Sequence, residues 1–194
     1  MEEDRELIVM CAGGDEGAFT ILYHRYKDRV LNYFYRFFGT QEQAEELMQE
    51  TFVRVWRGAP GFHGKGASFR TWLYTISHNL AISQLRKRHY LSLPLNEKPG
   101  VEQLKVANEI PLERQLIKRE EQEIVKRCLL RLPPRQREVI VLRHYEDLTF
   151  REISDVVDCP VGTAKTRFHY GIKRLYKLLR SEFKKREKGG ISLS

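Results

Sequence analysis

Cysteine is scarce in this sequence, and its scarcity excludes several classes of small protein. Cys11, Cys128 and Cys159 are far apart and odd in number, which argues against a disulfide framework and is typical of a reducing cytosol. Neither a CxxC nor an HExxH spacing occurs, so we expect no bound metal. We interpret the thiols as buried structural residues, with redox sensing as the alternative.

Long apolar runs are missing as well. No stretch approaches the roughly 20 apolar residues that span a bilayer, and residues 1–30 begin with charges and lack a long apolar core. We therefore expect a cytoplasmic chain without a signal peptide or membrane insertion. The glycine-rich stretch 58–67 lacks the GxxxxGK[ST] pattern of a nucleotide phosphate cradle. No cofactor and no small-molecule substrate are expected.

Basic residues are plentiful, with 34 Lys+Arg against 26 Asp+Glu and a formal charge of +8. Such a balance favours polyanionic partners. The excess is concentrated at residues 165–188, where Glu182 and Glu187 are the only acids, whereas residues 41–50 hold four glutamates and no Lys or Arg. One end of the molecule therefore suits nucleic acid, and another suits a different partner.

Helical periodicity dominates the pattern of apolar residues and predicts an all-α fold. The first half predicts helices over 15–38, 40–57 and 68–89, with Asp15 as an N-cap and a Thr40–Gln43 capping box. The prolines and the polar content of the next stretch predict a flexible linker between two small helical domains. The predicted divisions are a first domain at 1–90, a linker at 91–111, a second domain at 112–185 and a disordered tail at 186–194.

The most informative stretch, residues 148–179, predicts a helix-turn-helix. Thr149 and Glu152 can form a capping box at its start. The second helix is expected to bury one stripe, made of Ala164, Phe168, Ile172, Leu175 and Leu179. Its opposite face is basic and hydrogen-bonding, and carries Thr166, His169, Tyr170 and Lys173, flanked by Lys165 and Arg167. Such a helix suits a DNA major groove, although a helical hairpin with a solvated charged face is the alternative.

Three further features of the first half of the sequence can each be interpreted in two ways. The helix at 40–57 has an outer face that is acidic around one apolar residue, with Glu46, Gln49, Glu50 and Val53. This face is either solvated or a docking surface for a basic protein. The loop at 58–67 carries Phe62, His63 and Lys65, and is either mobile or able to close around an unstacked base. Thr75, Asn79 and Arg86 follow one flank of the next helix, where such side chains can contact bases and phosphates.

Five motifs occur in the order and spacing of one family. They are G-D-x-x-A-F at 14–19, A-E-[DE]-L-x-Q-E-x-F at 44–52, F-x-T-W-L-Y-x-I-x-x-N at 69–79, L-P-x-x-x-R-x-V at 132–139, and E-I-S with C-P-V-G-T-A-K-T-R at 152–167. Through them the chain resembles bacterial sigma factors of the extracytoplasmic-function group, which have only sigma regions 2 and 4. The resemblance covers nearly all of residues 5–185.

The resemblance implies a role for each feature. The first domain is similar to sigma region 2 and the second to sigma region 4. Glu46, Gln49, Glu50 and Val53 are similar to the face that docks on the clamp helices of core RNA polymerase. The −10 promoter element would be read by Phe62, His63, Lys65, Thr75, Asn79 and Arg86, around a flipped base. The −35 element would be read by Thr149, Arg151, Lys165, Thr166, Arg167, His169, Tyr170 and Lys173. Relatives are commonly controlled by an anti-sigma factor, which is often membrane-bound.

Some positions depart from the family pattern. Glu46 stands where many relatives have Asp, and His169 and Tyr170 stand where an aromatic residue and an arginine are common. A lost bidentate contact from arginine to guanine is worth about 1–3 kcal/mol, so the preferred promoter sequence should differ. His63, beside Phe62, has the same consequence for the −10 element.

Two rival functions account for less of the chain. A stand-alone helix-turn-helix regulator would explain residues 112–185 but leaves 44–79 unexplained. A metal-dependent nuclease would need clustered ligands, whereas the six histidines are scattered over different helices, at His24, His63, His78, His89, His144 and His169. The sequence therefore favours a sigma factor with no catalysis of its own, which binds core polymerase and promoter DNA.

Overall fold

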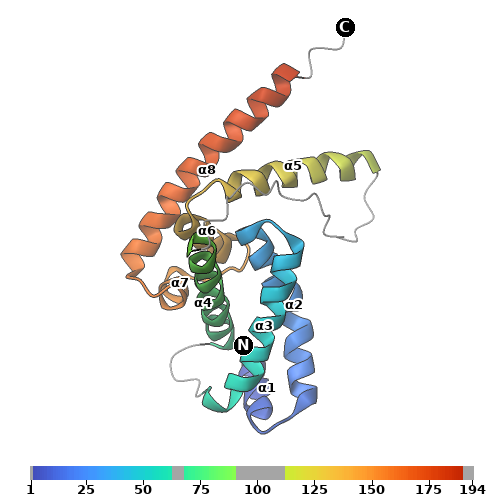
Figure 1. Ribbon diagram of the computed structural model, residues 1–194, viewed down its shortest axis with the longest axis vertical. Helices are drawn as coiled ribbons and strands as arrows, with labels where there is room; N and C mark the ends of the chain where they lie inside the picture. Colours follow the sequence, from blue (N-terminus) through green and yellow to red (C-terminus); the bar gives the residue numbers. More distant parts are fainter. Residues whose placement is uncertain (1, 63–67, 91–111, 190–194) are drawn as a thin grey trace.

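The chain folds into two helical bundles that pack directly on one another (Figure 1). The structure is a computed structural model that describes residues 2–62, 68–90 and 112–189. The first bundle comprises α1 (Glu2–Ala12), α2 (Glu16–Phe38), α3 (Gln41–Gly58), the 3-10 turn η1 (Ala59–Gly61) and α4 (Phe69–Tyr90). The second comprises α5 (Leu112–Leu130), α6 (Pro134–His144), α7 (Phe150–Val156) and α8 (Val161–Gly189). Over these ranges the fold is all-α, without strands.

Local signals explain most helix boundaries in the first bundle. Asp15 caps α2, because its side chain accepts a hydrogen bond from the Ala18 amide at 2.9 Å. Gly39 ends α2 with a φ of 89°, a left-handed conformation that glycine adopts without strain. Ser68 caps α4 through the Thr71 amide, at 3.1 Å. These boundaries agree with the predicted ones.

The predicted Thr40–Gln43 capping box is wrong. Thr40 is the N-cap residue of α3, but its side chain makes no capping hydrogen bond. Gln43 is buried, and without the hydrogen bond from Thr40 the reciprocal pair of a capping box is not formed. The helix begins at the predicted place without the predicted box.

Helix α1 was not predicted. It buries Leu7, Ile8 and Cys11 against the bundle, but its inner face also contains Asp4, which is 8% exposed. The Tyr26 hydroxyl donates to Asp4 Oδ2 at 2.7 Å, and Arg25 pairs with the other carboxylate oxygen. A charged residue on the inner face conceals the apolar stripe from a periodicity analysis.

Helix α8 differs from its prediction in two ways. Gly171 lies on its buried side, whereas Ile172, which was predicted to be buried, is 39% exposed. A Cβ at position 171 would lie 2.8 Å from Ile140 Cδ1, so α8 crosses α6 closest at this glycine and Ile172 turns outward. The helix also continues to Gly189, so residues 186–189 belong to it rather than to the predicted tail. Residues 190–194 and the predicted linker at 91–111 lie outside the described residues.

Candidate nucleic-acid interface

Helix α3 presents the acidic face as a continuous outer surface. Its opposite side is buried in the core of the first bundle through Ala44, Leu47, Met48, Thr51, Phe52 and Val55. Glu46 and Gln49 are exposed and Glu50 is half-buried. Val53, one turn further along the helix, is 41% exposed. Arg54 Nε donates to Glu50 Oε1 at 2.7 Å, so one carboxylate of the face already has a basic partner. The structure therefore brings the four residues together on one exposed surface.

Helix α4 carries a polar flank that the second bundle leaves accessible. Asn79 and Arg86 are exposed and Thr75 is half-buried. The Thr75 hydroxyl donates to the Thr71 carbonyl at 2.9 Å, which fixes its orientation along the helix. The flank offers an amide and a guanidinium to a polar ligand.

The loop before α4 is described only in part. The Phe62 ring is half-buried against Trp72, with 5.0 Å between the ring centroids. Its aromatic face is therefore already partly covered by a protein side chain. His63 and Lys65 lie outside the described residues.

The helix-turn-helix is held by local hydrogen bonds and a small apolar core. Thr149 Oγ1 accepts from the Glu152 amide at 3.2 Å, and Glu152 Oε2 accepts from the Thr149 amide at 2.8 Å, which confirms the predicted capping box. The turn passes through Asp158, whose φ is 46°, a conformation that aspartate tolerates better than most residues. The Phe150 and Phe168 rings then pack with centroids 5.4 Å apart. These contacts fix the angle between α7 and α8.

The basic face of α8 points into solvent as predicted. Lys165, Thr166, His169, Tyr170 and Lys173 are all exposed, and Arg167 is half-buried at their side. Tyr170 is 58% exposed. Thr149 and Arg151 are exposed at the start of α7, so both helices of the motif carry accessible polar side chains. The arrangement offers donors and a phenol ring to a nucleic-acid groove.

A buried polar seam between the bundles was not predicted. It contains Glu138 and Glu146 of the second bundle, which are 2% and 1% exposed. Glu138 Oε1 accepts from the Tyr33 hydroxyl at 2.7 Å and lies 2.7 Å from His78 Nδ1. Both partners of Glu138 belong to the first bundle.

The second carboxylate of the seam is held in the same way. Arg29 Nε donates to Glu146 Oε2 at 3.1 Å, and the Tyr74 hydroxyl donates to the same oxygen. Burial raises the pKa of Glu146 above its ordinary value, although Tyr74 and Arg29 oppose the shift. Burial and the neighbouring carboxylates likewise raise the pKa of Tyr33 and Tyr74 well above the usual range.

Arg137 anchors the seam near the end of α2. Its guanidinium donates to the carbonyl of Phe37 in the first bundle and to the carbonyls of Leu130 and Leu132 in the second. Burial lowers the pKa of Arg137 to about 10. The only available signal in the sequence was that charged residues interrupt the apolar pattern of the helix at 134–144. Their partners in the first bundle are 60 to 105 residues away, so the pairing could not be read from that signal.

Two kinds of feature are absent from the described residues. Within residues 2–62, 68–90 and 112–189, no three His, Cys, Asp or Glu side chains are placed to hold a metal ion. None of the helices described there has the length and apolar character needed to cross a bilayer. Cys11 and Cys128 are buried as predicted, and burial raises the pKa of both thiols. Cys159 is only half-buried.

Comparison with known proteins gives a consistent result. Residues 22–90 match the family model of Sigma-70 region 2, and residues 122–175 match that of Sigma-70 region 4. The sigma factor SigW of Bacillus subtilis is 34% identical over 172 residues, covering 86% of this chain and 91% of its own length.

Two solved structures share the fold. CnrH, in complex with the cytosolic domain of CnrY, has a TM-score of 0.66 and 23% identity, covering 92% of this chain and 98% of that one. RpoE of Bartonella quintana, in complex with the anti-sigma factor NepR, has a TM-score of 0.64 and 24% identity, covering 84% of this chain and 96% of that one. The chain belongs to the extracytoplasmic-function sigma factors of the sigma-70 family, which are transcription initiation factors and not enzymes.

Proposed function

We propose that the chain docks on core RNA polymerase through the outer face of α3 and contacts promoter DNA through α4, α7 and α8. One observation carries the proposal: the acidic docking face and the basic helix-turn-helix face lie on different bundles, and both are exposed. Opposite charges on separate surfaces allow a protein and a polyanion to bind at the same time. The cytoplasm, where bacterial transcription takes place, is the proposed location.

On the DNA side, the two bundles have different tasks. Lys165, Thr166, His169, Tyr170 and Lys173 would enter the major groove of the −35 element, with Arg167, Thr149 and Arg151 beside them. Thr75, Asn79 and Arg86, with the loop at 58–67, would contact the −10 element. Because Phe62 is half-buried against Trp72, it would support the wall of a base pocket rather than stack freely on a base.

The two bundles must separate to reach both elements. The two elements are separated by about 25 base pairs, or roughly 85 Å of duplex at 3.4 Å per base pair. In the structure α7 packs on α4, a helix only about 33 Å long at 1.5 Å per residue. The packed arrangement is therefore a closed form, and promoter binding requires the seam to part.

An anti-sigma factor is the proposed controlling partner. The solved Bartonella relative was captured with such a factor. In the proposal, a partner of this kind would act by holding the closed form or by covering the α3 face. Either action would prevent simultaneous engagement of polymerase and promoter.

The docking face is tested by charge reversal. The double variant Glu46→Lys with Glu50→Lys should bind core polymerase at least about tenfold more weakly, because like charges placed across an interface cost several kcal/mol. Asp28→Lys, exposed on α2, is the matched control and should bind normally. Equal affinity for the double variant and the wild type would refute the docking assignment.

Run-off transcription tests the whole function. Core polymerase stripped of other sigma factors should give discrete transcripts from fragments of the source genome only when this chain is added. The start sites would reveal the promoter sequence. Transcripts that are identical with and without the chain would contradict the proposal.

A further inference from the structure

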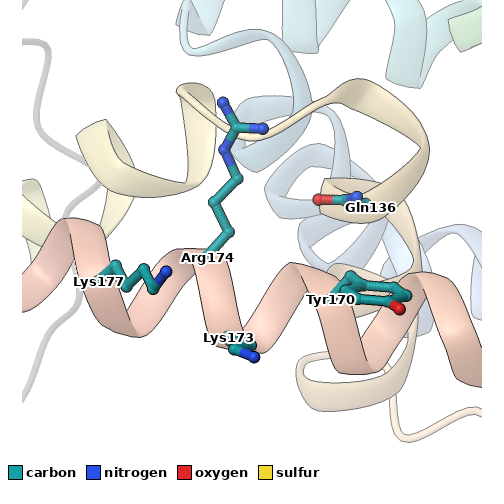
Figure 2. A pocket seen from close by; sticks show the side chains of 5 residues that line it. All are labelled: Gln136, Tyr170, Lys173, Arg174 and Lys177. Carbon is teal, nitrogen blue, oxygen red and sulfur yellow. The ribbon is translucent and has the colours of Figure 1, made fainter.

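A hollow of about 480 Å³ lies between α6 and the middle of α8. It is lined by Gln136, Tyr170, Lys173, Arg174 and Lys177, which Figure 2 shows on neighbouring turns of α8, with Gln136 across from them near the start of α6. Tyr170 and Lys173 are already part of the helix-turn-helix face, whereas the other three residues are not. The hollow therefore extends that face along the helix.

The charge of this hollow is uncompensated. Three of its five lining residues are cations and none is a carboxylate. Across residues 2–62, 68–90 and 112–189, Lys173, Arg174 and Lys177 form no ion pair, whereas Lys185 on the same helix pairs with Glu182 at 3.7 Å. Like charges four residues apart on a helix destabilise it by a few tenths of a kcal/mol. An anion bound between them would remove this cost.

The opposite wall of the hollow also favours an anion. Helix α6 starts there at Pro134, and the N-terminus of a helix carries a partial positive charge. Gln136 Oε1 is buried without a hydrogen-bond partner among the described residues; this oxygen is an acceptor, so it can take a hydrogen bond from a cation of the hollow but cannot bind an anion. A phosphate could accept hydrogen bonds from the cations that line the hollow.

We propose that this hollow binds phosphates of the DNA backbone beside the −35 element. The proposal rests on the proposed reading of that element by α8. His169 and Lys177 are both exposed and are eight positions apart, about 12 Å along the axis at 1.5 Å per residue. The major groove is also about 12 Å wide. If the axis of α8 crosses the groove in the proposed complex, Lys177 lies at the backbone that borders the groove when His169 faces base edges.

This contact would be a property of the extended helix. The match to sigma region 4 ends at residue 175, while α8 continues to Gly189. Lys177 lies in that extension. Phosphate contacts carry no sequence information, so the hollow would strengthen binding and fix the register of α8 on the duplex.

The test compares two variants that remove the same charge from the same helix. Arg174→Gln with Lys177→Gln alters the hollow, and Lys184→Gln with Lys185→Gln alters exposed residues outside it. Holoenzyme carrying each variant is titrated onto its promoter at several salt concentrations. The hollow variant should weaken binding at low salt and reduce the slope of log K against log salt by up to about 2, at about 0.9 per lost phosphate contact. The control should change the slope by less than half as much.

A neutral methylphosphonate placed at single backbone positions locates the contact. It should weaken binding by wild-type holoenzyme at one or two positions bordering the −35 element, and have no further effect on the hollow variant. Equal slopes for the hollow variant, the control and the wild type would overturn the proposal. A second result would also overturn it: the hollow binds inorganic pyrophosphate, but the hollow variant keeps the wild-type slope of log K against log salt for promoter binding. The site would then bind a small free anion.

The proposed −35 reading is tested separately with Lys165→Ala and Arg167→Ala. If that variant binds the promoter as wild type does, the reading by α8 is wrong. If it loses binding while the hollow variant keeps the full salt slope, the reading stands and only the phosphate site is wrong.

Discussion

The inside of the first bundle and the seam between the bundles are both buried, and one apolar cluster, which includes Val139, Val141 and Leu142, continues from one into the other. They differ in that the seam also buries two carboxylates. The bundle interior is mainly apolar, with fully buried Leu22, Phe34 and Leu73. The seam places Glu138 and Glu146 in contact with donors from the other bundle. Exposing apolar surface to water costs free energy, whereas carboxylates and their donors regain hydrogen bonds from water. The difference suits an interior that stays folded and a seam that can part.

The largest effect should come from a cavity inside the bundle. Phe34→Ala removes a fully buried ring and should lower the free energy of unfolding by about 4 kcal/mol, through lost burial and the cavity left behind. Denaturant unfolding followed by circular dichroism measures this. Val53→Ala, on the exposed face of α3, should change it by less than 1 kcal/mol. Similar losses for both variants would contradict the assigned core.

Truncating a carboxylate of the seam should have a smaller and different effect. Glu146→Ala leaves the buried Tyr74 hydroxyl and the half-exposed Arg29 guanidinium without their acceptor, which should cost the closed form about 1–3 kcal/mol. Small-angle scattering should show an expanded particle, while the helix content stays unchanged. Glu146→Gln keeps an acceptor and should expand less. Loss of helix content in Glu146→Ala would mean that the seam is part of one indivisible core.

A methyl group at the crossing of α6 and α8 should have an intermediate to small effect. In Gly171→Ala the new Cβ would lie 2.8 Å from Ile140 Cδ1 and 3.3 Å from Gln136 Cβ. The Ile140 side chain must turn away or the helices must shift apart, at a cost of about 1–2 kcal/mol, part of which the higher helix propensity of alanine offsets. Thermal unfolding should register this cost, and Gly162→Ala, which meets nothing within 4 Å, is the control. Equal stability of the two variants would place the closest approach elsewhere.

The smallest effect concerns pH. Because burial raises the pKa of Glu146, the closed form binds this proton more tightly than the open form does. Its contribution to closure is complete below the ordinary value of 4.5 and is lost as pH rises through the raised pKa. Small-angle scattering measured from pH 4.5 upward should show that the wild-type particle expands as pH rises. The Glu146→Gln particle should expand less. Identical profiles would show that other groups control closure.

Features set by neighbouring residues in the chain could be predicted from the sequence, whereas contacts between distant residues could not. The Thr149–Glu152 capping box spans three residues, so its chemistry is contained in the motif itself. The exposed basic face of α8 followed from helical period alone. The predicted buried face of α8 was wrong at Ile172. The place where α8 crosses α6 depends on Gly171 and on the position of α6, and the periodicity of one helix contains no information about its neighbour.

The seam illustrates the limit most clearly. Glu146 finds its partners at Arg29 and Tyr74, 117 and 72 positions away. Nothing in a pattern of apolar spacing indicates which buried donor a distant carboxylate will meet. Most of the described residues assigned to polymerase and promoter are exposed side chains whose partners lie outside this chain.

The distance between the bundles tests the central claim most directly. Fluorophores on Ile21→Cys in α2 and Tyr176→Cys in α8, both exposed positions, report this distance once Cys11, Cys128 and Cys159 are replaced by serine or alanine. Energy transfer should be high in the free chain, and it should stay high when the double variant Glu46→Lys with Glu50→Lys is mixed with polymerase at a concentration too low for that variant to dock. When core polymerase and a promoter are added, the transfer should fall, because the distance between the fluorophores should increase by tens of ångströms. The two promoter elements lie roughly 85 Å apart. Unchanged transfer in a complex that makes transcripts would contradict the account.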